Sequence, residues 1–138
     1  MRKLLSLLLL FASFSAAFCG DDFLGTRSSR FKDADYNFDL TRSALARAAH
    51  WERDAEYPPL SPRKARQIAL DQAKSLRPEV TNWRLDRISL EPIGDADWIY
   101  LVTYQDFSGP IFGVAWSLQI PVYFDGATIQ PKIRKFKP

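Results

Sequence analysis

The clearest helical pattern in the chain lies between two prolines, Pro62 and Pro78. Apolar residues recur there every three or four positions, which places them on one face of a helix. Ser61 suits the N-cap, and Pro62 suits the first helical position, where a backbone N–H has no partner within the helix. The pattern therefore predicts a helix that begins at Pro62 and ends before Pro78. Its apolar face would contain Ala65, Ile68, Ala69, Ala73 and Leu76.

The segments before this helix have weaker patterns. Residues 41–53 are rich in alanine and predict a second helix, which Asp39 or Thr41 would cap. Residues 20–38 mix charged residues, serine and glycine with scattered phenylalanine and show no clear period. This composition predicts a flexible lead-in before the folded domain.

After Pro78 the apolar period changes to two, which predicts strands. The phase slips between Leu85 and Ile88, and such a slip is typical of a β-bulge or a bend. The sequence Gly-Asp-Ala-Asp at 94–97 predicts a turn. Residues 98–105 are apolar on both phases, so we expect them to form a central strand of the sheet.

A second strand pattern follows, with apolar residues at every even position from Phe112 to Phe124. It predicts a one-sided strand, or two strands joined by a bend. Pro121 lies on the outward phase and has no N–H to donate, so this end is expected at a sheet edge. Asp125 and Gly126 suit a hairpin turn, and residues 128–133 would form a short final strand.

Taken in order, these elements predict an α+β fold, with one or two N-terminal helices packed on a three- to four-stranded antiparallel meander sheet. We expect a single domain over residues 39–138, with its core in residues 60–131. A chain of this length can bury a hydrophobic core without disulfides or a structural metal.

The first residues have the composition of a secretory signal peptide. Arg2 and Lys3 precede an apolar run from Leu4 to Phe14, and small residues follow. This run is shorter than the about 20 residues that a membrane-spanning helix needs. We therefore expect residues 1–19 to be a signal peptide and the protein to be exported, to the periplasm or outside the cell. Residues 1–19 contain two basic and no acidic residues, so their removal lowers the formal net charge from +3 to +1, which argues against a nucleic-acid partner.

Cys19 is the only cysteine, so the chain cannot form an internal disulfide. Its position after the apolar run is that of a lipid-modified cysteine. Phe18 is bulky, however, whereas lipoprotein signals have a small residue immediately before the cysteine. Cleavage after Ala17 or after Cys19 is therefore the favoured interpretation, and a membrane-anchored lipoprotein is the alternative.

The sequence contains few of the residues that catalysis or metal binding usually requires. His50 is the only histidine, so a zinc site with two or three histidines or cysteines cannot be built. No phosphate-binding glycine motif occurs. We therefore expect a protein that is not an enzyme and has no cofactor. A hydrolase without a recognised motif is a further hypothesis, and its candidate acids would be Glu91, Asp95, Asp97 and Asp106.

Two features are candidates for binding a partner. Trp98, Tyr100 and Tyr104 share one phase of the strand at 98–105. They would form a platform for a peptide or a sugar if that face is open, and part of the core if the helix predicted over residues 41–53 covers it, which is the favoured interpretation. The second feature is a basic tail, which would bind an anionic surface or simply be a solvated chain end. Its basic residues are Lys132, Arg134, Lys135 and Lys137.

Residues 60–129 resemble small exported domains of the PepSY-like, cystatin-like type. The resemblance rests on "SPRKARQIALDQA" as a leading helix, "DWIYLVTYQ" as a central strand, and "IPVYFDGATIQP" as a final strand with its Asp-Gly turn. The segments 20–59 and 106–117 depart from the compact PepSY pattern.

The resemblance implies a non-enzymatic module outside the cytoplasm that binds a protein or peptide, in some members as a peptidase inhibitor, and it transfers no catalytic residue. The alternative is an envelope-attached structural or accessory protein, held to the membrane by an acylated Cys19 or by the basic tail.

Overall fold

The computed structural model describes residues 22–52, 54–108 and 115–136. The predicted signal peptide (residues 1–19), with Cys19, lies outside the described residues, and so does Lys137. Among the described residues, neither helix has the length and hydropathy needed to cross a membrane.

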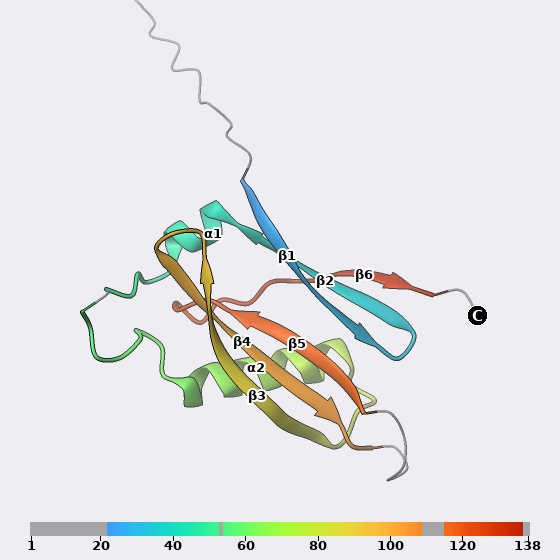
Figure 1. The fold of residues 1–138 in the computed structure, drawn as a ribbon. Coiled ribbons are helices and arrows are strands. Elements are labelled where there is room, and N and C mark those ends of the chain that lie inside the picture. The colour runs from blue at the N-terminus through green and yellow to red at the C-terminus, as the bar shows by residue number, and fades with distance from the viewer. Residues whose placement is uncertain (1–21, 53, 109–114, 137–138) are drawn as a thin grey trace, which may run out of the picture.

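Strands form most of the regular secondary structure, and they make two antiparallel sheets of three strands each (Figure 1). One sheet has the strand order β1-β2-β6 and the other β3-β4-β5. The elements in chain order are β1 (Phe23–Phe31), β2 (Ala34–Thr41), α1 (Arg42–Arg47), α2 (Pro62–Leu76), β3 (Trp83–Ile93), β4 (Asp97–Asp106), β5 (Trp116–Val122) and β6 (Lys132–Lys135).

The predicted fold class, with N-terminal helices on a single meander sheet, was wrong. The structure is mostly β, and the hairpin β1–β2 occupies residues that were expected to be a flexible lead-in. The hydrophobic core accordingly extends beyond the predicted residues 60–131. Every second residue of β2 is buried, while Asp and Asn residues alternate with the buried ones. Those polar residues give the segment the composition of a loop, which hides its strand period. The buried residues are Ala34, Tyr36, Phe38 and Leu40.

The helix predicted over residues 41–53 is much shorter in the structure. Thr41 caps it, because its hydroxyl accepts a hydrogen bond from the Ala44 N–H. α1 then ends at Arg47, and Leu45 is its only buried residue. A helix this short is held by tertiary contacts rather than by helix propensity. The chain continues as an irregular connector, described over residues 48–52 and 54–60, that leads to α2.

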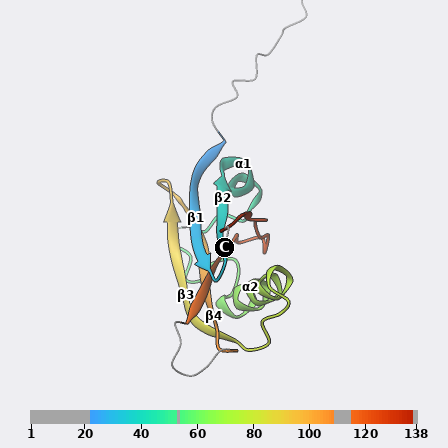
Figure 2. The same ribbon diagram turned by 90° about the vertical axis from the view of Figure 1, so that its right-hand side faces the viewer.

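The helix predicted at Pro62 is confirmed as α2, with Ser61 as its N-cap. α2 lies against β4 and β5 on one side of the molecule, as Figure 2 shows. Two tyrosines of β4 link the sheet to the helix segment. The Tyr100 hydroxyl donates to the Leu60 carbonyl, and the Tyr104 hydroxyl donates to the Arg66 carbonyl, each at 2.8 Å.

The other predictions for the strands have mixed outcomes. β4 is the central strand of its sheet, and the register shift between Leu85 and Arg87 confirms the predicted bulge. Gly126 has a φ of +84°, as the predicted turn requires. The predicted final strand at 128–133 was wrong. Thr128 forms only an isolated bridge to Val122 of β5. The last strand, β6, begins at Lys132 and pairs with β2 instead.

A single serine joins the two sheets where β1 passes the edge of β5. The Ser29 hydroxyl accepts a hydrogen bond from the Gln119 N–H at 2.9 Å and donates one to the Ser117 carbonyl at 3.2 Å. The N–H groups of every second residue in a strand point to the same side. The Gln119 N–H points toward β1, so residue 121 would present the next N–H to that side, but proline has none. A continuous backbone ladder therefore cannot form here, and a side chain makes the connection instead.

Two ion pairs also cross from the β1–β2 hairpin to the second sheet. Arg27 binds Glu91 on β3 at 3.0 Å, and Lys32 binds Asp106 on β4 at 2.7 Å. Asp106 is 8% exposed. Burial acts to raise the pKa of Asp106, but hydrogen bonds from Lys32 and Ser108 outweigh it and hold that pKa below its ordinary value.

Candidate functional site

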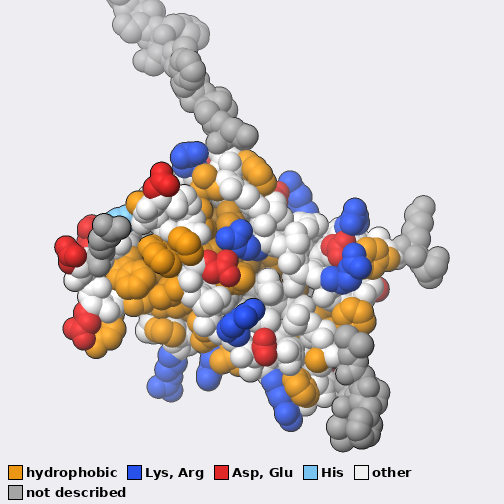
Figure 3. Space-filling model, in the orientation of Figure 1, with side chains coloured by type: hydrophobic (Ala, Val, Ile, Leu, Met, Phe, Trp, Pro, Cys, Tyr) orange, Lys and Arg blue, Asp and Glu red, His pale blue; other side chains and the backbone are white. Residues whose placement is uncertain are grey.

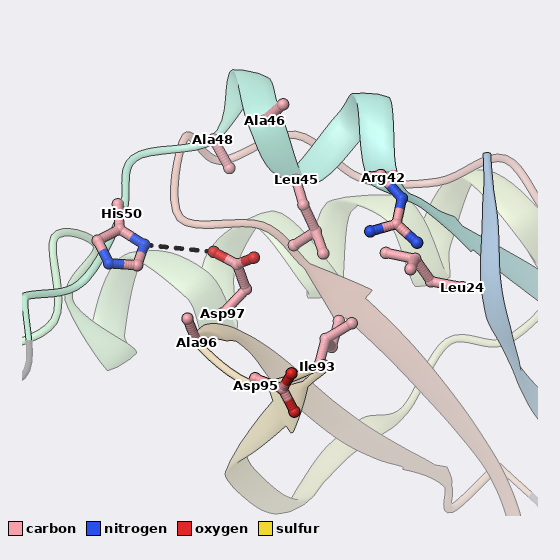
Figure 4. Close-up of a pocket in the computed structure, with 11 residues that line it drawn as sticks. Leu24, Arg42, Leu45, Ala46, Ala48, His50, Ile93, Asp95, Ala96 and Asp97 are labelled. Atoms are coloured by element: carbon pink, nitrogen blue, oxygen red, sulfur yellow. Dashed lines mark hydrogen bonds and ion pairs between the residues drawn. The ribbon is translucent and has the colours of Figure 1, made fainter. Parts of the chain in front are cut away.

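A groove lies between the turn that joins β3 to β4 and the chain that runs from α1 into the connector (Figure 4). It consists of two adjoining cavities, a larger one of about 540 Å³ and a smaller one of about 350 Å³. His50, Asp95 and Ala96 line both cavities, which makes them one elongated site. We call it the turn groove.

The larger cavity has an apolar floor and charged ends. Leu45 of α1 and Ile93 of β3 are buried beneath it, and Figure 4 shows them pointing toward one another. Arg42 lies at one end. At the other end His50 Nδ1 lies 3.3 Å from Asp97 Oδ1, which ties the connector to the start of β4.

The smaller cavity is lined by two tryptophans at the end of a chain of aromatic rings. Phe124 contacts Tyr100 at a centroid distance of 5.4 Å and Trp51 at 6.2 Å, and Trp51 contacts Trp98 at 5.9 Å. The Trp51 indole N–H also donates to the Ala55 carbonyl, which holds the connector in place. Core packing thus positions Trp98, which remains 36% exposed.

Carboxylates accompany the tryptophans in the smaller cavity. Glu52 and Asp95 line it, and neither has an ion-pair partner among the residues that the structure describes. Figure 3 shows acidic side chains and the histidine beside the hydrophobic patch at the left of the molecule. The charged side chains described around the smaller cavity are therefore acidic, whereas Arg42 lines the far end of the larger cavity.

The structure separates the three aromatic residues that the sequence placed on one phase. Tyr100 and Tyr104 are 1% and 3% exposed and belong to the core, but α2 covers them rather than the helix predicted over residues 41–53. Burial raises the pKa of both phenols because it disfavours the phenolate. Only Trp98 reaches the surface, at the end of the strand.

Most of the basic tail forms β6, which pairs with β2 in the β1–β2–β6 sheet and does not line the turn groove. Lys132 binds Asp39 at 2.6 Å and Arg134 binds Asp35 at 2.9 Å. Hydrogen bonds from these basic side chains lower the pKa of both aspartates. Lys135 is exposed at the end of β6. Two of the predicted charges are thus paired with acidic neighbours rather than presented as a basic cluster.

The candidate acids of the hydrolase hypothesis fall into two groups. Asp95 and Asp97 line the turn groove, whereas Glu91 and Asp106 form the ion pairs that join the sheets. Within the described part of the chain, no group of three or more His, Cys, Asp or Glu side chains is arranged to hold a metal ion.

Sequence reasoning missed most of the turn groove. It identified Trp98 and the candidate acids Asp95 and Asp97, but it used His50 only to exclude a zinc site and gave Glu52 no role. The only available signal was the sequence His-Trp-Glu just after an alanine-rich helix, and nothing in it indicates the β3–β4 turn as its neighbour. Searches with family models, curated protein sequences and solved structures found no match for this chain, so they neither support nor oppose the PepSY-like resemblance.

Proposed function

We propose that this chain is an exported, non-enzymatic domain that binds a protein or peptide in the turn groove. The observation that carries the proposal is Trp98, a large aromatic side chain held half-exposed at a groove with an apolar floor. Tryptophan is strongly enriched among the residues that dominate binding energy in protein interfaces. A rigidly packed tryptophan also loses little conformational entropy when a partner binds.

The shape and charge of the turn groove favour an extended ligand. Two adjoining cavities give it length, and its charged side chains are spread along it, with Arg42 at one end, Asp95 lining both cavities and Glu52 at the other end. Apolar surface between a few polar anchors is the usual composition of a binding site, in which the polar groups set the orientation of the ligand.

Photo-crosslinking in the native host tests the proposal. A benzoylphenylalanine at Ala96, in the centre of the groove, should give a discrete protein or peptide adduct with the full chain. The same residue at Arg63, on the exposed face of α2, is the matched control and should give none. The Trp98→Ala substitution should abolish the adduct at position 96. Equal adducts at both positions, or an adduct that is unaffected by Trp98→Ala, would refute the turn groove as the binding site.

Export is tested by the intact mass and N-terminal residue of the protein purified from its host. A free N-terminus at Phe18 or Gly20 is expected and corresponds to a cleaved, soluble form. An acylated Cys19 would favour the envelope-attached alternative, and a retained Met1 would contradict export.

A further inference from the structure

We infer that the Trp98 end of the turn groove binds a lysine or arginine side chain of the partner. This inference rests on the proposed function and specifies the chemistry of its ligand. It follows from the combination, in one cavity, of an exposed indole ring and two carboxylates, Glu52 and Asp95, that have no ion-pair partner among the residues that the structure describes.

The aromatic part of the cavity suits a cation. The exposed indole of Trp98 meets Trp51 in an edge-to-face arrangement, with 68° between the ring planes. Tryptophan is the best of the aromatic side chains at attracting a cation to its face, and a guanidinium group can also stack on it. The ring chain through Phe124 fixes the position of this indole pair, so the surface exists before a ligand arrives.

The carboxylates of the cavity favour a ligand with a positive charge. Glu52 and Asp95 line the cavity beside Trp98, while Asp97 is paired with His50. The basic Arg42 lies at the far end of the larger cavity. A cationic side chain would thus find an aromatic face and two carboxylates together, whereas an anion would meet repulsion from both carboxylates.

The opposite polarity of the two ends would also orient the partner. With its basic side chain beside Trp98, an extended peptide would continue over the apolar floor formed by Leu45 and Ile93 toward Arg42. An acidic side chain or a terminal carboxylate would be favoured at that end.

Two matched peptides test the inference with the full chain labelled with ¹⁵N. Acetyl-Gly-Arg-Gly-amide carries the cation, and acetyl-Gly-citrulline-Gly-amide has nearly the same shape without the charge. The indole N–H signal of Trp98 should shift saturably as the arginine peptide is added. The protein should bind the citrulline peptide about threefold to tenfold more weakly than the arginine peptide. Added salt should reduce this preference, because salt screens exposed charges.

Substitutions separate the carboxylates from the general charge of the protein. Asp95→Asn together with Glu52→Gln should weaken arginine-peptide binding about threefold to tenfold and leave citrulline-peptide binding unchanged. Asp54→Asn is the matched control, since Asp54 is an exposed carboxylate of the same connector that does not line the groove. It should have less than about a twofold effect.

The outcomes distinguish this inference from the proposed function. Equal binding of the two peptides, or equal effects of the groove and control substitutions, would overturn the cation site. If the arginine peptide does not bind while the crosslink at Ala96 still depends on Trp98, the inference fails and the proposed function stands. If both experiments fail and a neutral oligosaccharide shifts the Trp98 signal instead, the groove is a sugar site and both proposals are wrong.

Discussion

Replacing Ser29 with alanine tests how the two sheets are joined. The side chain is 6% exposed, and its hydroxyl makes the only hydrogen bonds seen between β1 and β5 among the described residues. The substitution removes both bonds without adding volume. It leaves the Gln119 N–H and the Ser117 carbonyl without their Ser29 partner.

The expected loss of stability follows from these two bonds. A typical hydrogen bond within a protein contributes about 1 kcal/mol net, and a buried group left without a partner costs about 1–3 kcal/mol. Because the two backbone groups are only partly buried, we expect Ser29→Ala to lower the free energy of unfolding by about 2 kcal/mol. This is a substantial part of the stability of an ordinary small domain, which is about 5–15 kcal/mol.

Urea unfolding followed by tryptophan fluorescence and by circular dichroism measures the effect. Ser28→Ala is the matched control, because Ser28 is the adjacent residue and its hydroxyl bonds to Asn37 on the exposed face. It should change the free energy of unfolding by less than about 0.5 kcal/mol. Hydrogen exchange at the Gln119 amide should accelerate in Ser29→Ala alone. If the two variants prove equally stable, the serine bridge does not join the sheets.

Two further substitutions test the core and the second link between the sheets. Tyr100→Phe removes a buried hydroxyl bonded to the carbonyl just before α2 and should lower the free energy of unfolding by about 1 kcal/mol, measured by urea unfolding; unchanged stability would contradict the role of this bond. Asp106→Asn should destabilise at pH 7, because the folded state holds the pKa of Asp106 below its ordinary 3.8 and its ion pair with Lys32 then contributes fully. The stability gap to the wild type should close as the pH falls below about 3.8, through the folded-state pKa of Asp106; a gap that is independent of pH would show that Asp106 acts through packing alone.

The sequence predicted local elements wherever neighbouring residues specify them. Ser61 and Pro62 set the start of α2, the phase slip after Leu85 marked the bulge in β3, and Gly126 marked the turn after β5. Each of these signals acts within a few residues, so it can be interpreted without the rest of the chain.

The β1–β2 hairpin was missed because its strand period is mixed with turn-forming polar residues. Its partner β6 lies near the other end of the chain, and Asp35 and Asp39 on its exposed face bind Arg134 and Lys132. The pairing with β6 thus gives these acidic residues basic partners from a distant part of the chain. β-propensity depends on cross-strand neighbours, which a local pattern does not contain.

In the turn groove, too, the local sequence predicts some features and contacts between distant segments decide the others. The sequence by itself determined that Trp98 lies near the start of a largely buried strand and that an Asp-rich turn precedes it. The tertiary structure alone decided that Tyr100 would be covered by α2, and that Trp51 and Glu52 would be brought beside the turn. The physical reason is that exposure and charge pairing are set by contacts between distant segments, whereas turns and caps are set by adjacent residues.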